Sequence, residues 1–224
     1  PDEVKLTPQL KMSPKQLELK VKIDYLLDWK WPTGAQLSKE EAMWAELKGS
    51  TYSKAYTFSP FEVKEFMDPP KDAMEFVKES PKVDIAMEAA RLVKNHKMAW
   101  TYWVVMYVAK YVSHTDLMVD YLVNNVWFKK EEVGVIKGGI KDEEKELIKD
   151  KFNSWKIKVL IGWDNIKEGI DLQMNGVLSI NLAPWWNPAE LIQFWWRVRR
   201  QGNPLNYVGM MIPLLENSGD IGIF

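Results

Sequence analysis

The chain has 224 residues, of which 46% are hydrophobic and 27% are charged, and its net charge is −1. This size and composition fit one large domain, or one domain with an extension, around a substantial core. The near-zero net charge means that any basic surface for nucleic acid must be local. The chain has no cysteine and only two histidines, so we exclude disulfides and thiolate sites and predict no metal site.

No hydrophobic run reaches the length of a membrane span, and the N-terminus lacks a signal-peptide pattern. We therefore expect an intracellular protein, cytoplasmic or nuclear, that does not bind a membrane. The sequence begins at Pro1 instead of Met, which is typical of a fragment or a processed product.

Residues 1–80 are predicted to form helices joined by irregular segments. Ser13 and Gln16 enclose Pro14 in the pattern of a capping box, and Ser38 with Glu41 repeats that pattern. The segment "WKWPTG", residues 29–34, separates the two helices. The proline-interrupted segment 56–72 predicts a packed loop.

From about residue 81 the pattern changes to alternating helices and strands. Helical spacing runs through Ile85, Ala89 and His96, and a second helix is predicted to start at Thr115 as its cap. Asn187-Pro188 is predicted to start a later helix. Strands are predicted near 102–108, 132–136, 157–162, 177–182 and 207–212. This alternation predicts an α/β fold with a mainly parallel sheet covered by helices on both faces.

Ligands of such sheets bind where loops leave the carboxyl ends of the strands. "EGIDLQ", residues 168–173, follows one predicted strand, and a helix ending in Arg197, Arg199 and Arg200 follows another. Arg197 and Arg200 share a helical face and suit a polyanion such as a triphosphate. By spacing alone, a solvated basic helix end and a turn with a capping Asp171 are the simpler interpretations.

Sequence patterns of several other enzyme classes are missing. The chain has no G-x-S-x-G elbow, no H-E-x-x-H, no G-x-G-x-x-G after a strand and no phosphate loop G-x-x-x-x-G-K-[ST]. His114 precedes a predicted helix start, where a lone histidine is more often a surface residue than a ligand.

Three ordered segments, "GVIKGGIKDEEKELIKDKFNSWKIKVLI", "KEGIDLQ" and "WNPAELIQ" with the following "RVRRQGN", resemble the second motor lobe of superfamily-two helicases. The Trp-Asn-Pro step at 186–188 is similar to the Swi/Snf-related branch of ATP-driven DNA translocases. Gln193, Arg197, Arg200 and Gly202 match the last motif of that family. The resemblance covers about residues 80–215 and implies a RecA-like lobe over 81–224, preceded by a helical extension over 1–80.

The resemblance also implies roles for individual residues. Arg197 and Arg200 become catalytic arginine fingers, which stabilise charge on the transferred phosphoryl group of ATP. Gly169, Asp171 and Gln193 are the expected ATP-binding residues. Mg²⁺ and most of the ATP contacts belong to a first RecA-like lobe, which this sequence lacks, so the fragment alone should not hydrolyse ATP. Contacts to the backbone of DNA, or of RNA, are expected from Lys110, Gly138, Gly139, Lys167 and Gln173.

Two departures from the family pattern stand beside these motifs. Trp196 occupies a position where the family usually has Gly or a small acidic residue, and Trp163 one where Ser or Thr is common. They are consistent with a degenerate lobe or an altered sequence. The alternative function is therefore a non-catalytic interaction module that binds proteins through exposed tryptophans. Stacking of single-stranded bases on aromatic rings is a third hypothesis, which the neutral charge balance disfavours.

Overall fold

The computed structural model describes residues 2–31, 34–98, 101–162, 177–183 and 207–222. The chain divides into two compact units, one formed by residues 1–8 and 85–213 and the other by residues 9–84 and 214–224. Each unit therefore combines stretches that lie far apart in the sequence. The two units are described separately below.

The first unit contains a six-stranded sheet with the strand order β1-β7-β6-β3-β5-β4, in which all five pairings are parallel. The strands are β1 (Asp2–Leu6), β3 (Trp103–Tyr107), β4 (Val133–Ile136), β5 (Val159–Gly162), β6 (Val177–Asn181) and β7 (Tyr207–Met211). Every residue of β3, β5 and β6 is buried, as is typical of parallel strands covered on both faces.

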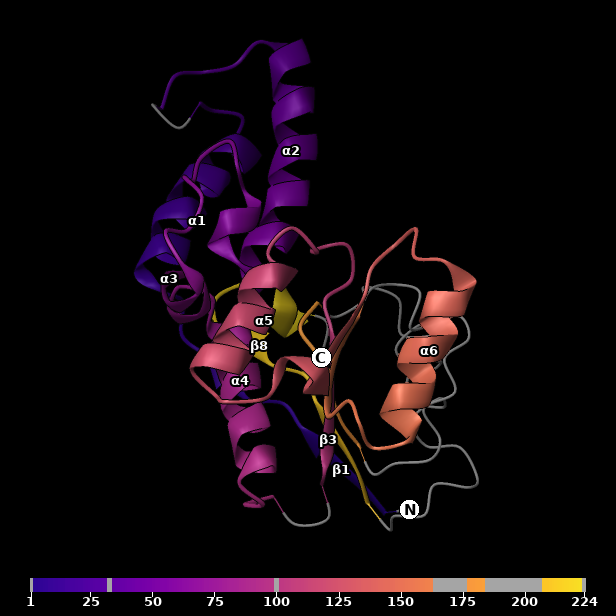
Figure 1. The fold of residues 1–224 in the computed structure, drawn as a ribbon. Helices are drawn as coiled ribbons and strands as arrows, with labels where there is room; N and C mark the ends of the chain where they lie inside the picture. The colour runs from indigo at the N-terminus through magenta and orange to yellow at the C-terminus, as the bar shows by residue number, and fades with distance from the viewer. Residues whose placement is uncertain (1, 32–33, 99–100, 163–176, 184–206, 223–224) are drawn as a thin grey trace. The chain divides into compact units, whose positions relative to one another are not determined.

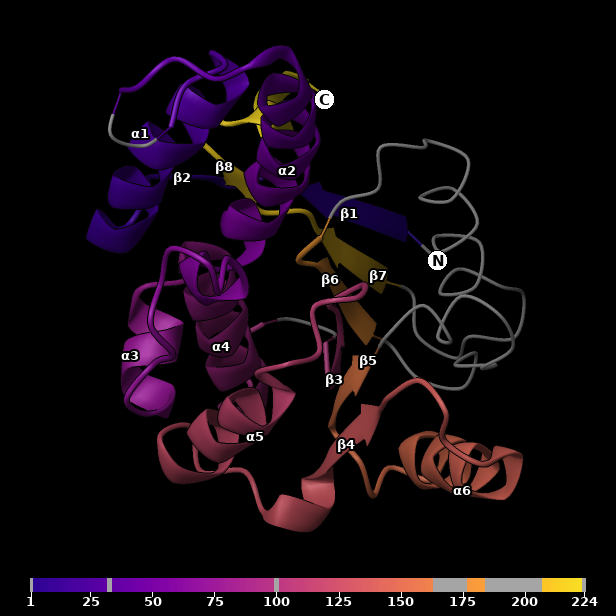
Figure 2. The same ribbon diagram turned by 90° about the horizontal axis from the view of Figure 1, so that it is seen from above.

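Helices cover both faces of this sheet. Figure 2 shows α5 (Thr115–Asn124) on one face and α6 (Asp142–Asn153) on the other. The part of α4 (Pro81–Lys94) that belongs to this unit lies on the same face as α5. A short 3-10 helix, η2 (Lys130–Glu132), leads into β4. The predicted α/β lobe with a mainly parallel sheet is confirmed, and this architecture is RecA-like.

The second unit is mainly helical. It contains α1 (Pro14–Leu27), α2 (Lys39–Phe58), η1 (Pro60–Glu62) and α3 (Ala73–Lys78), which Figure 1 shows in indigo to magenta. Two-residue strands β2 (Gln9–Leu10) and β8 (Leu214–Leu215) pair in parallel, and η4 (Gly219–Gly222) follows. The predicted capping boxes are confirmed: Ser13 Oγ accepts from Gln16 N at 3.2 Å, and Ser38 Oγ accepts from Glu41 N at 3.3 Å.

Some local predictions were wrong or incomplete. Residues 1–80 were expected to be helical or irregular, but they also supply β1 and β2. Thr115 is the first residue of α5 and not its cap, since its hydroxyl donates to the Val112 carbonyl at 3.0 Å. The strand expected near 207–212 is β7, which ends at Met211, and Pro213, which has no N–H to donate, separates it from the short β8. The predicted helix start at Asn187-Pro188 lies outside the described residues.

A buried ion pair ties the end of the chain into the second unit. Lys82 Nζ lies 2.6 Å from Asp220 Oδ2, and both side chains are almost fully buried. The same carboxylate oxygen accepts from Leu215 N at 2.9 Å. Burial lowers the pKa of Lys82, and the charge of Asp220 opposes that effect. The pair therefore fixes residues 214–220 against the first turn of α4.

Lys82→Met is expected to lower the free energy of unfolding by about 3–5 kcal/mol, because the buried Asp220 carboxylate loses its cation. The double variant Lys82→Met/Asp220→Asn should recover part of this loss, since the amide carries no charge. Urea unfolding of the full chain measures both. Equal losses in the single and double variants would contradict a coupled pair.

Candidate nucleotide and nucleic-acid interface

Four strands of the first unit end in register at one edge of the sheet. Tyr107 at the end of β3 pairs with Asn181 of β6 on one side and with Gly162 of β5 on the other, and Gly162 pairs with Ile136 of β4. We call this row of four residues the carboxyl edge. Because the strands are parallel, the chain segments that follow them start side by side. In open α/β sheets, this is where ligands bind.

The segment after β3 carries Lys110. Val108 N donates to the Gly162 carbonyl at 3.0 Å, which anchors the start of this segment to β5. Ala109 has a left-handed backbone with φ of 49°, and Lys110 is exposed, with its Nζ 5.9 Å from the centre of the Tyr111 ring. The predicted nucleic-acid contact Lys110 thus presents its charge to solvent beside the carboxyl edge.

The segment after β4 is the turn that holds Gly138 and Gly139. Both glycines are exposed, and Gly139 has φ of 78° with no atom within 4 Å of the place a Cβ would take. Its backbone is therefore open to a close approach by another molecule. Lys137 precedes the turn, and its Nζ lies 3.1 Å from Asp116 Oδ1 on the first turn of α5.

Two further residues at this edge were missed by the sequence reasoning. Lys137 is one, and its only sequence signal is its position beside the two glycines. Asn181 is the other: it is fully buried, and its Oδ1 accepts from Ala183 N at 3.1 Å. Its side-chain NH₂ has no hydrogen-bond partner among the described residues. A buried donor without a partner is uncommon and marks Asn181 as a candidate ligand contact.

The other predicted site residues lie outside the described residues. Their place in the sequence still ties them to the carboxyl edge. Lys167, Gly169, Asp171 and Gln173 follow β5, and Gln193, Arg197 and Arg200 follow β6. The structure thus brings together the starts of the segments that hold every predicted site residue, while the roles of these residues stay predictions.

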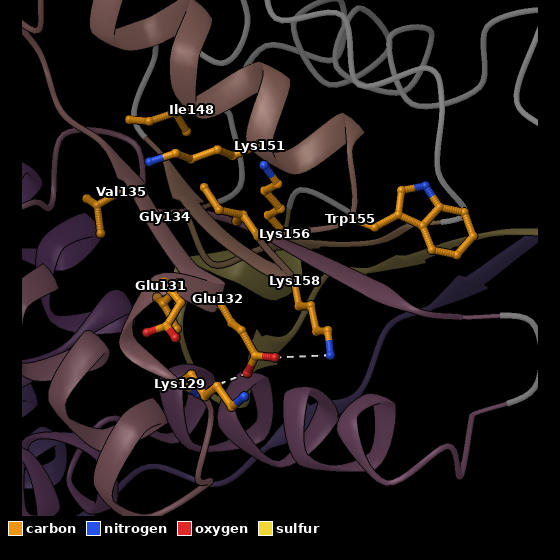
Figure 3. Close-up of a pocket in the computed structure, with 12 residues that line it drawn as sticks. Lys129, Glu131, Glu132, Gly134, Val135, Ile148, Lys151, Trp155, Lys156 and Lys158 are labelled. Carbon is orange, nitrogen blue, oxygen red and sulfur yellow. Dashed lines mark hydrogen bonds and ion pairs between the residues drawn. The ribbon is translucent and has the colours of Figure 1, made fainter.

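A separate groove lies around the amino-terminal ends of β4 and β5. Its volume is about 580 Å³, and Figure 3 shows four lysines and two glutamates around it. Glu132 Oε1 lies 3.1 Å from Lys158 Nζ, and Glu132 Oε2 accepts from Lys129 N at 2.9 Å. Burial alone would raise the pKa of Glu132, but these two partners outweigh it and lower that pKa. The groove is basic and lies at the end of the sheet opposite the carboxyl edge.

The described part of the chain offers neither a metal site nor a membrane-spanning helix. No group of three or more His, Cys, Asp or Glu side chains there is placed to hold a metal ion. No helix among the same residues has the length and hydrophobicity to cross a bilayer.

The parallel sheet and the segments that start together at its carboxyl edge define the class of RecA-like motor lobes. The family model of the helicase conserved C-terminal domain matches residues 88–202, just over half the chain. The chain belongs to this family, which confirms the resemblance to superfamily-two helicases. No curated protein matches.

Solved structures share the fold. The C-terminal part of the Fun30 ATPase domain is 13% identical, with a TM-score of 0.68 over 100% of this chain and 88% of that chain. The C-terminal domain of a Sulfolobus solfataricus SWI2/SNF2 ATPase is 15% identical, with a TM-score of 0.68 over 99% and 83%. The core of the Sulfolobus solfataricus SWI2/SNF2 ATPase in complex with dsDNA is 17% identical in sequence. Its TM-score is 0.69, over 100% of this chain and 43% of that chain.

Gly139→Ala is expected to destabilise the chain by about 1–2 kcal/mol more than Gly138→Ala, because a Cβ disfavours the left-handed backbone that Gly139 adopts. Thermal or urea unfolding of the two variants measures the difference, and Gly138→Ala is the matched control one residue away. Equal effects at the two positions would show that the turn has another conformation in solution.

Proposed function

We propose that this chain is the second motor lobe of an ATP-dependent DNA translocase or helicase. The observation that carries the proposal is the carboxyl edge, where the segments that hold all the candidate residues start side by side. Membership of the helicase C-terminal family supports it. The fold shared with Swi2/Snf2 ATPases, one of them in complex with dsDNA, supports the translocase branch and DNA as the partner.

In this proposal ATP and Mg²⁺ lie between this lobe and a first RecA-like lobe. The first lobe supplies the phosphate loop and the metal ligand. This lobe supplies Arg197 and Arg200, whose guanidinium groups stabilise the charge that builds up on the transferred phosphoryl group. Gly169, Asp171 and Gln193 complete the nucleotide side of the cleft. This chain by itself is then expected to show no ATP hydrolysis.

Nucleic acid binds through its backbone in this proposal. Lys110 and the Gly138–Gly139 turn are exposed at the carboxyl edge, and Lys167 and Gln173 follow β5 in the chain. Contacts from lysine and backbone N–H groups to phosphates position a duplex without reading its sequence. Asp116 partly neutralises Lys137, so the surface at this turn carries little excess positive charge. Binding by this lobe alone should accordingly be weak.

Arg197→Ala and Arg200→Ala are each expected to lower kcat about 10³-fold or more in a longer chain that carries both lobes, with a modest change in nucleotide affinity. Arg199→Ala is the matched control within the same predicted helix and should have a mild effect. Trp196→Gly should raise turnover if its ring obstructs the cleft. Steady-state ATPase with saturating DNA measures all four.

Equal, small effects at 197, 199 and 200 would reduce this segment to a basic helix end and would contradict the motor function. The alternative, a non-catalytic interaction module, predicts that a chain with both lobes has no DNA-stimulated ATPase at all. ATP hydrolysis by the present chain alone, after removal of contaminating ATPases, would contradict its assignment as a second lobe.

Binding of a labelled DNA duplex is expected to weaken steeply with salt and to depend little on base sequence, because it rests on a few phosphate contacts. Lys110→Ala should weaken binding to all sequences alike and reduce the slope of log K against log salt by about 0.9. Lys48→Ala, an exposed lysine in the other unit, is the control. Tight binding at high salt, or an unchanged slope in Lys110→Ala, would contradict this mode.

A further inference from the structure

Three tryptophans have a backbone conformation that normally belongs to glycine. The described residues include six non-glycine residues with positive φ, and three of these are Trp29 (60°), Trp127 (67°) and Trp155 (72°). Left-handed non-glycine residues are uncommon and are mostly Asn, Asp or His, because a Cβ crowds the following carbonyl. Three of these six residues therefore carry tryptophan, the largest side chain.

Two of the three stand at the position after a helix where glycine is strongly preferred. After α1, Trp29 N donates to Leu26 O at 3.2 Å and Lys30 N donates to Tyr25 O at 2.8 Å. After α6, Trp155 N donates to Phe152 O at 3.1 Å and Lys156 N donates to Lys151 O at 2.9 Å. These bond pairs are the Schellman motif, whose left-handed residue is usually glycine.

Trp127 follows a third helix in a related, wider turn. Asn125 is the C-cap of α5, and Phe128 N donates to Leu122 O at 3.0 Å, which closes the turn around the left-handed Trp127. The chain then enters η2 and β4. All three tryptophans thus reverse the chain at the end of a helix.

Burial of the indole rings does not explain these tryptophans. The exposed fractions of the three residues are 51% at Trp29, 74% at Trp127 and 58% at Trp155, so about half or more of the surface of each residue stays in water. Within the described part of the chain, Trp155 makes an edge contact with Trp103, with the two ring centres 4.4 Å apart. Each position therefore combines an unfavourable backbone conformation with little burial of the side chain. Tryptophan normally stabilises a protein by burying its large ring, so these positions do not favour tryptophan.

We propose that positions 29, 127 and 155 are glycine positions, and that the protein carries glycine there in its own cell because the codon behind each of these tryptophans is read as glycine. UGA is the candidate for this codon, since its reading differs between genetic codes. The composition fits: the chain has 12 tryptophans, as many as its glycines. Trp196, which stands where the resembling family usually has Gly or a small acidic residue, fits as well. The proposal does not rest on the motor function.

Peptide mass spectrometry of the protein isolated from its natural source tests the proposal directly. Cleavage after lysine gives peptides 23–30, 111–129 and 152–156, each with one of the three positions and no other tryptophan. Glycine masses are expected in all three. Peptide 40–48, with Trp44 inside α2, is the calibration peptide. A tryptophan mass at the three positions would overturn the proposal.

Unfolding of the recombinant chain gives a second, independent measurement. The triple variant Trp29→Gly/Trp127→Gly/Trp155→Gly is expected to unfold at a higher urea concentration than the chain with three tryptophans, since glycine adopts the left-handed backbone without strain. Trp44→Gly is the matched control, because Trp44 is equally exposed but lies within α2, so its replacement should lower the midpoint. A lower midpoint in the triple variant would contradict the assignment of these positions to glycine.

Discussion

The parallel register of β6, β3, β5 and β4 is the constraint on which the candidate site depends. Tyr107, Gly162, Ile136 and Asn181 are aligned across these strands, so four separate loops start within one row. A slip of one residue in any strand would turn its buried side chains toward the opposite face of the sheet. The packing of side chains on both faces thus fixes the register of the strands. The register in turn aligns the starts of the four loops that form the candidate site.

The carboxyl edge of the sheet and the opposite end, at the amino termini of β4 and β5, carry different chemical groups. The carboxyl edge offers glycine backbone, a few lysines and a buried amide donor, which suits contacts to phosphates. The groove at the amino-terminal ends of β4 and β5 carries four lysines, of which Lys158 is paired with Glu132.

The sequence predicts the central strands well because β3, β5 and β6 are short, continuous hydrophobic runs between turn signals. It fails for β1, because Asp2–Leu6 has three charged residues in five and its partner β7 is about two hundred residues away. It also fails for β8, whose pairing with β2 depends on where Pro213 interrupts the chain. A local sequence pattern predicts a helix or a strand, but it does not predict which distant strand a segment pairs with.

The candidate site likewise contains residues that the sequence predicts and residues that only the structure reveals. Lys110, Gly138 and Gly139 were predicted from family motifs, and the sheet places them beside its carboxyl edge. Asn181 was missed because its signal, a buried side-chain NH₂ with no partner among the described residues, exists only once the strands are packed. Lys137 was missed because an exposed lysine beside a turn is common. Gly169, Asp171, Gln193, Arg197 and Arg200 stay predictions from the motifs.

The division of the chain between the units has a consequence for the order of folding during synthesis. Asp220 leaves the ribosome more than a hundred residues after Lys82, and β7 leaves long after β1. Until residues 207–220 emerge, the ammonium group of Lys82 has no Asp220 carboxylate to pair with, and β1 has no β7. Contacts of such high sequence separation form slowly, since a long loop must close first. Neither unit can complete its native contacts while the chain grows, so both are completed together at the end of translation of this segment.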